Sequence, residues 1–244
     1  MKAATKIIIY DDGCPLCAAY TAVFVKAGLL EDTGRKSFTD IDSATFNLVD
    51  KTKCHNEIPL VDIETKQVWY GIDALLEILD RKIPFIKWIG NLKPIKWFLQ
   101  LLYNFISFNR KVIVASVSAN KYDCSPDFNT GYRTAFLLFF LLFNSYMLLP
   151  FYHTVFRNSI ISNSSYLQIQ VAHCLLVACN ITGALFLPKR KAFEYLGQIN
   201  MLALICILLL LPLYMVNTVA ANKYLNNFYL GMVCLFIIKE YTRR

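Results

Sequence analysis

Acidic side chains are almost missing from the second half of the chain. Residues 131–244 contain only two, Glu194 and Glu240, against nine Lys and Arg, whereas residues 1–130 contain 15 acidic and 16 basic residues. The formal charge of +8 is therefore concentrated beside long apolar runs. This pattern is typical of the flanks of membrane spans and not of a phosphate-binding surface, so we expect no nucleic-acid partner.

Metal and haem ligands are also scarce. The soluble half offers, beyond one cysteine pair, only the adjacent Cys54 and His55, which are poorly spaced to chelate together. No pair of histidines suggests haem, and we expect neither a metal nor an organic cofactor. We also expect no signal peptide, because Met1–Ile9 is too short and a soluble region follows it.

The most informative residues that are present form a cysteine pair where a strand is expected to meet a helix. Ile7–Tyr10 has the composition of a buried strand, Asp11–Gly13 of a turn, and Ala18–Phe24 the apolar periodicity of a helix. The helix dipole and the unpaired N–H groups of the first turn favour a thiolate at Cys14. The pattern predicts a dithiol redox centre of Cys14 and Cys17; half of a zinc site and two buried structural cysteines are the alternatives.

The rest of the soluble half predicts a thioredoxin-like α/β domain over residues 1–82. The expected elements alternate as strand, helix, strand, helix, strand, strand, helix, with the cysteine pair at the first helix. After that helix they are a strand at Lys36–Ile41, a Ser-capped helix at Ser43–Asp50, strands at Glu57–Ile63 and Lys66–Tyr70, and a helix at Gly71–Leu79.

Pro59 begins the third expected strand. A thioredoxin-like domain keeps a cis-proline beside its thiols at this place, so we predict a cis Ile58–Pro59 bond and a role for Pro59 as a backbone platform for the substrate thiol. The alternative is an ordinary trans proline at the start of a strand.

Three motifs closely resemble those of the DCC family of thiol-disulfide oxidoreductases. They are Asp-x-x-Cys-x-x-Cys at Asp11, Cys14 and Cys17, then Ile58-Pro59-Leu60, and then aromatic-Gly-x-Asp-Ala at Tyr70–Ala74. The family often has Gly directly after the Asp, where this chain has Asp12 and places its glycine at position 13. The resemblance covers about residues 5–120 and implies the fold and a redox role.

Asp11 has two interpretations. It is either a buried carboxylate that relays protons to Cys17, with a pKa raised by desolvation, or a turn former whose side chain caps the helix at Cys14. In both cases a nearby anion opposes the helix dipole and keeps the Cys14 thiol from becoming extremely acidic.

Residues 83–130 form a basic connector that contains two tryptophans, Trp88 and Trp97, and no acidic residue before Asp123. Its polar residues lie at helical spacing opposite a wide apolar face; they are Lys96, Gln100, Asn104, Ser107 and Lys111. This composition indicates a helix at a lipid interface, or a helix packed on the soluble core or the first span. Cys124 could act as a third thiol, although a loop cysteine is more often incidental.

Residues 131–244 are expected to form an all-α bundle of four transmembrane helices. Each apolar stretch is near the roughly 20 residues that cross a bilayer; the stretches are Tyr132–Phe151, Leu167–Leu187, Tyr195–Val216 and the weaker Val219–Ile238. Basic residues at positions 189–191 and after position 238 place both termini in the cytoplasm of a bacterial-type inner membrane. His173 and Asn180 in the second stretch suggest interhelical hydrogen bonds, with electron relay as the alternative.

These observations predict an enzyme, a membrane-tethered thiol-disulfide oxidoreductase. Cys14 would be the attacking thiolate and Cys17 the resolving thiol, with protein or small-molecule thiols and disulfides and the lipid bilayer as partners. The alternative is a non-catalytic membrane scaffold or transport accessory that binds a partner through the thioredoxin-like domain. A transmembrane electron conduit is less favoured, because the expected outer loops, His153–Tyr166 and Asn217–Tyr224, contain no cysteine.

Overall fold

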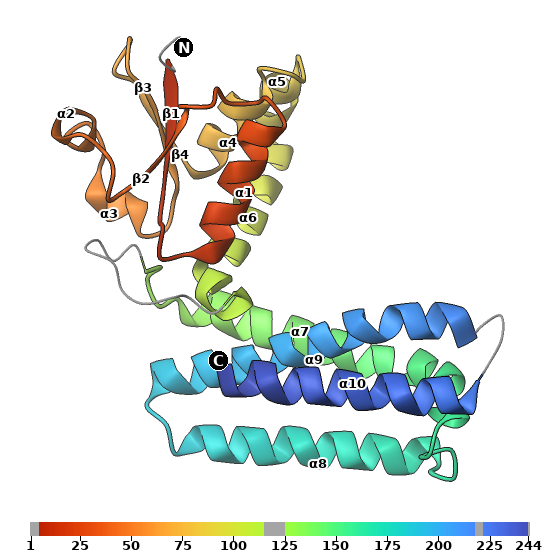
Figure 1. Ribbon diagram of the computed structural model, residues 1–244. Helices are drawn as coiled ribbons and strands as arrows, with labels where there is room; N and C mark the ends of the chain where they lie inside the picture. Colours follow the sequence, from red (N-terminus) through yellow and green to blue (C-terminus); the bar gives the residue numbers. More distant parts are fainter. Residues whose placement is uncertain (1–4, 115–124, 218–221, 244) are drawn as a thin grey trace. The chain divides into compact units, whose positions relative to one another are not determined.

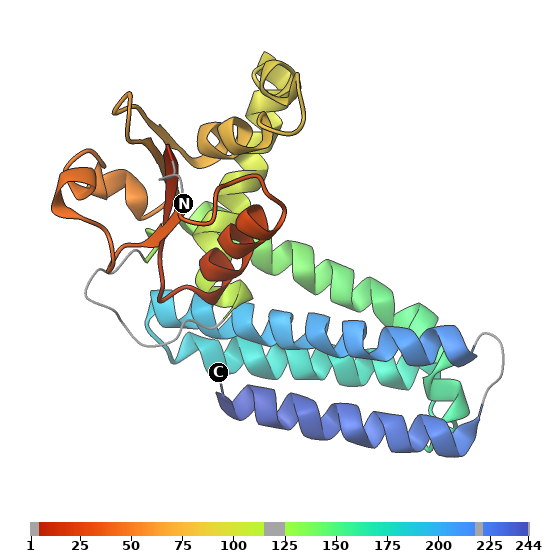
Figure 2. The same cartoon turned by 45° about the horizontal axis from the view of Figure 1, so that its top comes forward.

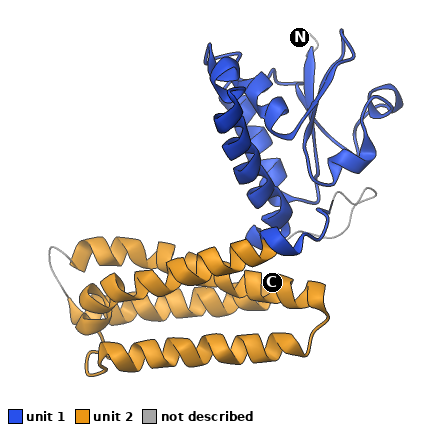
Figure 3. Ribbon diagram, turned by 180° about the vertical axis from the view of Figure 1, so that it is seen from behind, with its two compact units in different colours: residues 1–132 blue, residues 133–244 orange. Residues whose placement is uncertain are grey.

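The chain divides into two compact units, residues 1–132 and residues 133–244 (Figure 3). The computed structural model describes residues 5–114, 125–217 and 222–243, so Cys124 lies outside the described residues (Figure 1). Each unit is described by itself below.

The first unit contains a four-stranded mixed sheet. Its strands are β1 (Lys6–Tyr10), β2 (Arg35–Ser37), β3 (Pro59–Asp62) and β4 (Val68–Tyr70), in the order β2-β1-β3-β4. β1 pairs with β2 in parallel, and β3 is antiparallel to both β1 and β4. This order confirms the thioredoxin-like prediction for the soluble part of the chain.

Helices cover both faces of this sheet (Figure 2). In β1, Ile8 packs toward α1 (Pro15–Lys26) and α4 (Gly71–Leu79), whereas Ile7 and Ile9 pack toward α2 (Ser43–Phe46) and α3 (Lys51–Cys54). Because successive strand residues point to opposite faces, the run of three isoleucines contributes to both hydrophobic cores. A strand that is buried on both faces explains why β1 is continuously apolar.

The helix expected at Ser43–Asp50 ends already at Phe46, a second short helix that was not expected follows at Lys51–Cys54, and the predicted Ser cap is wrong. The carboxylate of Asp42 caps α2 by accepting the Thr45 N–H at 2.9 Å, and Asp50 caps α3 by accepting the Thr52 N–H at 3.0 Å. An ionised carboxylate at the N-cap satisfies a free N–H and also interacts favourably with the helix dipole. The expected strand at Lys36–Ile41 is likewise shorter, ending at Ser37.

The predicted cis bond before Pro59 is wrong: the Ile58–Pro59 peptide is trans. Pro59 is the first residue of β3 and pairs with Tyr70 of β4, a position where a strand accepts an ordinary trans proline. Trans is also the lower-energy isomer unless the surroundings impose cis. The thioredoxin-like assignment therefore rests on strand order. The role of Pro59 as a backbone platform for the substrate stays a prediction, but the cis bond that suggested it is absent.

Gly71, in the aromatic-Gly-x-Asp-Ala motif, begins α4 with a φ of +56°. Only glycine adopts this left-handed conformation without strain. A β-carbon here would also lie 3.2 Å from the Glu57 side chain and 3.3 Å from the ring of Tyr103. The motif glycine thus permits the turn from β4 into α4 and the close approach of a later helix.

The connector forms two helices, α5 (Ile86–Gly90) and α6 (Lys93–Ile113), within the first unit. Three side chains of α6 bind the segment before β3. The Tyr103 hydroxyl accepts the Ile58 N–H at 2.9 Å, Ser107 donates to the Asn56 carbonyl, and Arg110 Nη2 donates to the His55 carbonyl at 3.1 Å. Of the polar stripe predicted for this helix, Ser107 contacts this segment and Lys96 bonds to Asp73 at 2.7 Å, whereas Asn104 bonds to Gln100 and Tyr132.

The second unit is helical, with α7 (Thr130–Thr154) beginning just before it and α8 (Tyr166–Leu185), α9 (Lys189–Asn217) and α10 (Lys223–Arg243) within it. A short 3-10 helix, Phe156–Asn158, follows α7. Among the described residues, three helical segments are long and apolar enough to cross a membrane: Thr130–Asn158, Tyr166–Leu185 and Lys189–Asn217. The predicted fourth span forms α10, which is not among these three segments, so its crossing stays a prediction.

Polar side chains of this unit hydrogen-bond between helices, as predicted. Ser145 Oγ and His173 Nε2 are 2.9 Å apart, and Asn144 Nδ2 donates to the Asn200 carbonyl at 3.1 Å. Such bonds satisfy polar groups that lipid cannot solvate.

The anchoring of α6 can be tested with Tyr103→Phe. This change leaves the Ile58 N–H without its acceptor, and we expect it to cost about 1–3 kcal/mol of local stability. Hydrogen–deuterium exchange of peptides that contain Ile58 should become faster. Tyr146→Phe, which removes a hydroxyl from an exposed side chain of the other unit, is the control and should leave this exchange unchanged. Equal protection of Ile58 in the Tyr103 variant and the wild type would contradict the anchor.

Candidate dithiol site

The cysteine pair lies where β1 ends and α1 begins. The Asp11 carbonyl accepts the Cys14 N–H at 3.2 Å, and the Asp11 carboxylate accepts the Gly13 N–H at 3.0 Å. This turn brings Cys14 to the N-cap position of α1, and Pro15 occupies the first turn, where no N–H is needed. The structure therefore brings together Asp11, Cys14 and Cys17 as the sequence predicts.

The sulfur of Cys14 itself caps the helix. It accepts the backbone N–H of Cys17 at 3.4 Å, a contact with one of the free N–H groups of the first turn. Both cysteines are thiols and only 3% exposed.

The two thiols are expected to titrate very differently. A side-chain hydrogen bond from Cys17, supported by the Cys17 backbone N–H and by Arg110, lowers the pKa of Cys14 from 9.0 to about 6, although burial and Asp11 oppose the shift. The same hydrogen bond to Cys14, together with burial, raises the pKa of Cys17. We therefore expect Cys14 to be the thiolate and Cys17 the proton-bearing partner near neutral pH.

Arg110, in the basic connector, is a site residue that the sequence analysis did not single out. Its side chain is buried, and its positive charge lowers the pKa of Cys14, Cys17 and Asp11. The spacing of Tyr103, Ser107 and Arg110 on one face of a helix could have indicated an inward-facing polar edge. Nothing in the sequence, however, says which loop that edge contacts.

Asp11 behaves as a turn former, but its side chain does not cap the helix, because the sulfur of Cys14 occupies that position. Burial raises the pKa of Asp11, opposed first by the charge of Arg110 and then by the Gly13 N–H. A carboxylate with a raised pKa beside two thiols is suited to exchange protons with them. The proton-relay role of Asp11 is compatible with the structure and stays a prediction.

A cavity of about 260 Å³ opens beside Cys17, between α1 and α6. Cys17, Arg110 and Ser107 are among its lining residues, but most of the wall is aromatic or aliphatic; the others are Leu16, Tyr20, Phe24, Leu75, Tyr103 and Ile106. Pro59 is not part of this wall, but the adjacent residue Ile58 is bound to it through Tyr103. The cavity can therefore receive an apolar group close to the dithiol.

A second set of contacts braces the helix that carries the thiols. The Thr21 hydroxyl donates to the Cys17 carbonyl at 2.7 Å and accepts the Arg35 Nε–H at 2.9 Å. The guanidinium of Arg35 also lies 3.9 Å from the centroid of the Tyr10 ring, at the end of β1. These contacts, which the sequence did not reveal, tie α1 to β1 and β2 and hold the dithiol in place.

Within residues 5–114, 125–217 and 222–243, no three His, Cys, Asp or Glu side chains gather closely enough to hold a metal ion. Cys54 lies in the core beneath the sheet, and its thiol donates to the Asp50 carbonyl at 3.2 Å.

Comparison with known proteins agrees with the geometry of the site. Residues 8–115 match the family model described as DCC1-like thiol-disulfide oxidoreductase, a range that includes the dithiol, the β3 proline, the Gly71 motif and Arg110. No curated protein and no solved structure gives a significant match. Residues 8–115, somewhat less than half of the chain, are thus similar to the DCC1-like thiol-disulfide oxidoreductase family.

Proposed function

We propose that this protein is a membrane-tethered thiol-disulfide oxidoreductase that exchanges disulfides through Cys14 and Cys17. The observation that carries the proposal is the hydrogen bond at the start of α1, in which the Cys17 N–H donates to the Cys14 sulfur at 3.4 Å. A thiolate is the nucleophile of disulfide exchange, and this arrangement stabilises one thiolate while keeping its neighbour protonated.

The first step is attack by the Cys14 thiolate on one sulfur of a substrate disulfide. A Cys14–substrate mixed disulfide forms, the substrate S–S bond breaks, and the other substrate sulfur leaves as a thiolate. Cys14 then no longer carries a negative charge. The hydrogen bond to that charge is what raised the pKa of Cys17 most, so the first step makes Cys17 easier to deprotonate.

The second step is attack by the Cys17 sulfur on the Cys14 sulfur. The Cys14–Cys17 disulfide forms, the second substrate sulfur leaves, and two electrons have passed from the dithiol to the substrate. The Cys17 proton goes to the Asp11 carboxylate or to the departing thiolate, and Arg110 stabilises the negative charge that moves among these groups. The exchange is reversible and needs no metal or organic cofactor.

The substrates are thiols or disulfides, consistent with the family of residues 8–115. Because each cysteine is only 3% exposed, a substrate has to bind closely against the Asp11–Cys14 turn or enter the cavity beside Cys17.

The dithiol domain and the C-terminus face the cytoplasm in this proposal. Three apolar helices support membrane insertion, and Lys189, Arg190 and Lys191 are the first residues of the third, directly after the short loop that follows the second. Short basic loops are retained on the cytoplasmic side, which is also a reducing compartment where a cysteine pair is more often redox-active than structural.

Single substitutions of the two cysteines test the mechanism. Cys17→Ser should accumulate mixed disulfides with substrate, because the resolving attack is lost, and Cys14→Ser should abolish exchange. Cys54→Ala, in the same unit but outside the site, should retain exchange. Mass spectrometry of trapped adducts and a disulfide-reduction assay provide the readouts. Full exchange activity in Cys14→Ser would instead support a non-catalytic scaffold.

The pH dependence of alkylation tests the assignment of the thiolate. The pKa of Cys14 is below the ordinary 9.0, so its alkylation rate should rise through a midpoint near 6 and then level off. Alkylation of Cys17, whose pKa is raised, should stay slow over the same range. Timed alkylation of the reduced protein with peptide mapping measures both rates. Equal rates at the two thiols would be incompatible with the mechanism.

The role of Arg110 is tested by Arg110→Met and Arg110→Lys. Removal of the buried positive charge should move the Cys14 alkylation midpoint to higher pH and slow the reaction severalfold near pH 6, whereas lysine should restore part of the effect. Arg81→Met removes an exposed charge that pairs with Glu31 and is the matched control. An unchanged midpoint in a folded Arg110→Met protein would rule out this electrostatic role.

Topology reporters test the orientation. Fusions after Lys191 and after the C-terminus should both report cytoplasm, since positive loops favour that side. A cytoplasmic signal from the first with an external signal from the second would mean that α10 does not cross the membrane.

A further inference from the structure

The polar and apolar faces of helix α6 are placed the opposite way from those of an ordinary surface helix. Its polar side chains face the protein, where Lys96, Ser107 and Arg110 bond to Asp73, Asn56 and His55. Its large apolar side chains point outward instead, and Trp97 is 69% exposed and Phe98 57% exposed. Leu101, Leu102 and Ile106 continue this exposed face. A soluble helix normally buries its apolar face, so the outward face of α6 requires an apolar covering.

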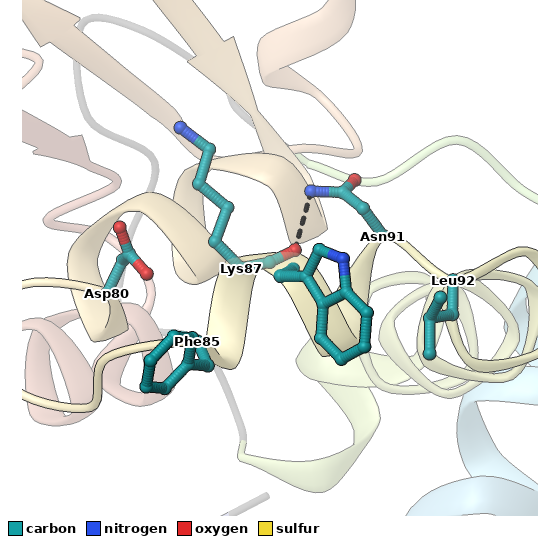
Figure 4. Close-up of a pocket in the computed structure, with 6 residues that line it drawn as sticks. Asp80, Phe85, Lys87, Asn91 and Leu92 are labelled. Carbon is teal, nitrogen blue, oxygen red and sulfur yellow. Dashed lines mark hydrogen bonds between the residues drawn. The ribbon is translucent and has the colours of Figure 1, made fainter.

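The preceding helix extends the same exposed apolar character. Phe85 and Trp88 are 73% and 68% exposed, and with Leu92 they border a cavity of about 570 Å³ that Lys87, Asp80 and Asn91 complete (Figure 4). Phe85 has a φ of +74°, a conformation that a bulky residue rarely adopts. The chain therefore holds an aromatic ring outward despite an unfavourable backbone conformation.

The charge of this region fits an anionic covering. From Ile83 to Ile113 there is no acidic residue, and the basic residues of α5 and the start of α6 are Lys87, Lys93 and Lys96, whereas Arg110 is buried at the dithiol site. Lys87 and Lys96 form ion pairs with Glu77 and Asp73. Lys93 opens α6 as an exposed residue beside the aromatic face. Trp with exposed aliphatic residues and flanking Lys is the composition of a segment that lies in the head-group region of a bilayer.

We propose that the α5–α6 surface, made of Phe85, Trp88, Leu92, Trp97, Phe98, Leu101 and Leu102, inserts into the head-group region of an anionic lipid bilayer. A bilayer is favoured as the occupant because the same chain carries three apolar helices long enough to span one, the first of which begins at Thr130, shortly after α6 ends. The opposite face of α6 provides Tyr103, Ser107 and Arg110 to the dithiol cavity. A single helix thereby links lipid contact on one face to the redox site on the other.

The tryptophans of this chain make the proposal directly measurable. There are three, Trp69, Trp88 and Trp97, and none lies in the apolar helices of the second unit. Bilayers of phosphatidylglycerol and phosphatidylcholine with bromine on the upper acyl chain quench tryptophans that enter the interface. The full-length protein reconstituted in these vesicles should lose much of the fluorescence of Trp88 and Trp97, and that of Trp69 in β4 should be unaffected.

Four variants assign the signal. In Trp88→Phe and Trp97→Phe, part of the quenching should disappear, and in the double variant only unquenched Trp69 should remain. Trp69→Phe should keep the full quenching. These substitutions lie outside the dithiol site, so a normal Cys14 alkylation profile shows that each variant is folded and separates this test from that of exchange activity.

The proposal is overturned if brominated lipids leave Trp88 and Trp97 fluorescence unchanged in a protein whose Cys14 reacts normally. That result would mean that another protein surface, such as a second copy of the chain or its own helical unit, covers these residues. Quenching confined to Trp69 would overturn it as well. Removal of phosphatidylglycerol should reduce the quenching severalfold, and equal quenching in purely neutral vesicles would overturn the electrostatic part of the proposal.

Discussion

The chemistry of this protein depends on the hydrogen bonds that reach the sulfur of Cys14 at the start of α1. A helix leaves its first N–H groups without partners inside the helix, and one of them, from Cys17, is directed at this sulfur. The Cys17 thiol supplies a second donor. The turn at Asp11 and the brace through Thr21 and Arg35 fix the geometry of the pair, so the acidity of Cys14 follows from the way β1 is joined to α1.

The pKa values of the two thiols differ because the pair holds one proton near neutral pH and that proton stays on Cys17. Near neutral pH a second negative charge at Cys17 would lie beside the first in a nearly dry site, and this cost holds the proton on Cys17. The buried guanidinium of Arg110 partly compensates the charge of Cys14 and Asp11. Loss of the Cys14 charge in a mixed disulfide removes the largest contribution to the high pKa of Cys17, so the proposed steps follow in order without an external base.

Helix α6 makes the connector part of the redox domain. The family match extends to residue 115 and so includes this helix, and its inner face supplies one wall of the dithiol cavity. Hydrogen bonds from α6 to His55, Asn56 and Ile58, in the segment before β3, hold the helix on the core, where apolar packing would ordinarily do so. Because the polar face of α6 contacts the core, the aromatic residues on its apolar face remain exposed.

The sequence by itself determined the strand, turn and helix around the cysteine pair, the order of helices and strands along the soluble domain, the bounds of α4 and the presence of three long apolar helices, because each depends on local periodicity and turn chemistry. It was wrong about the Ile58–Pro59 isomer, since that depends on the strand pairing around Pro59. It predicted the polar stripe of α6 but could not say which of its residues contact the core. Only the tertiary structure decided that, and only it brought Arg110 to thiols more than 90 residues away, because such contacts depend on how separate elements pack and leave no periodic trace in the chain.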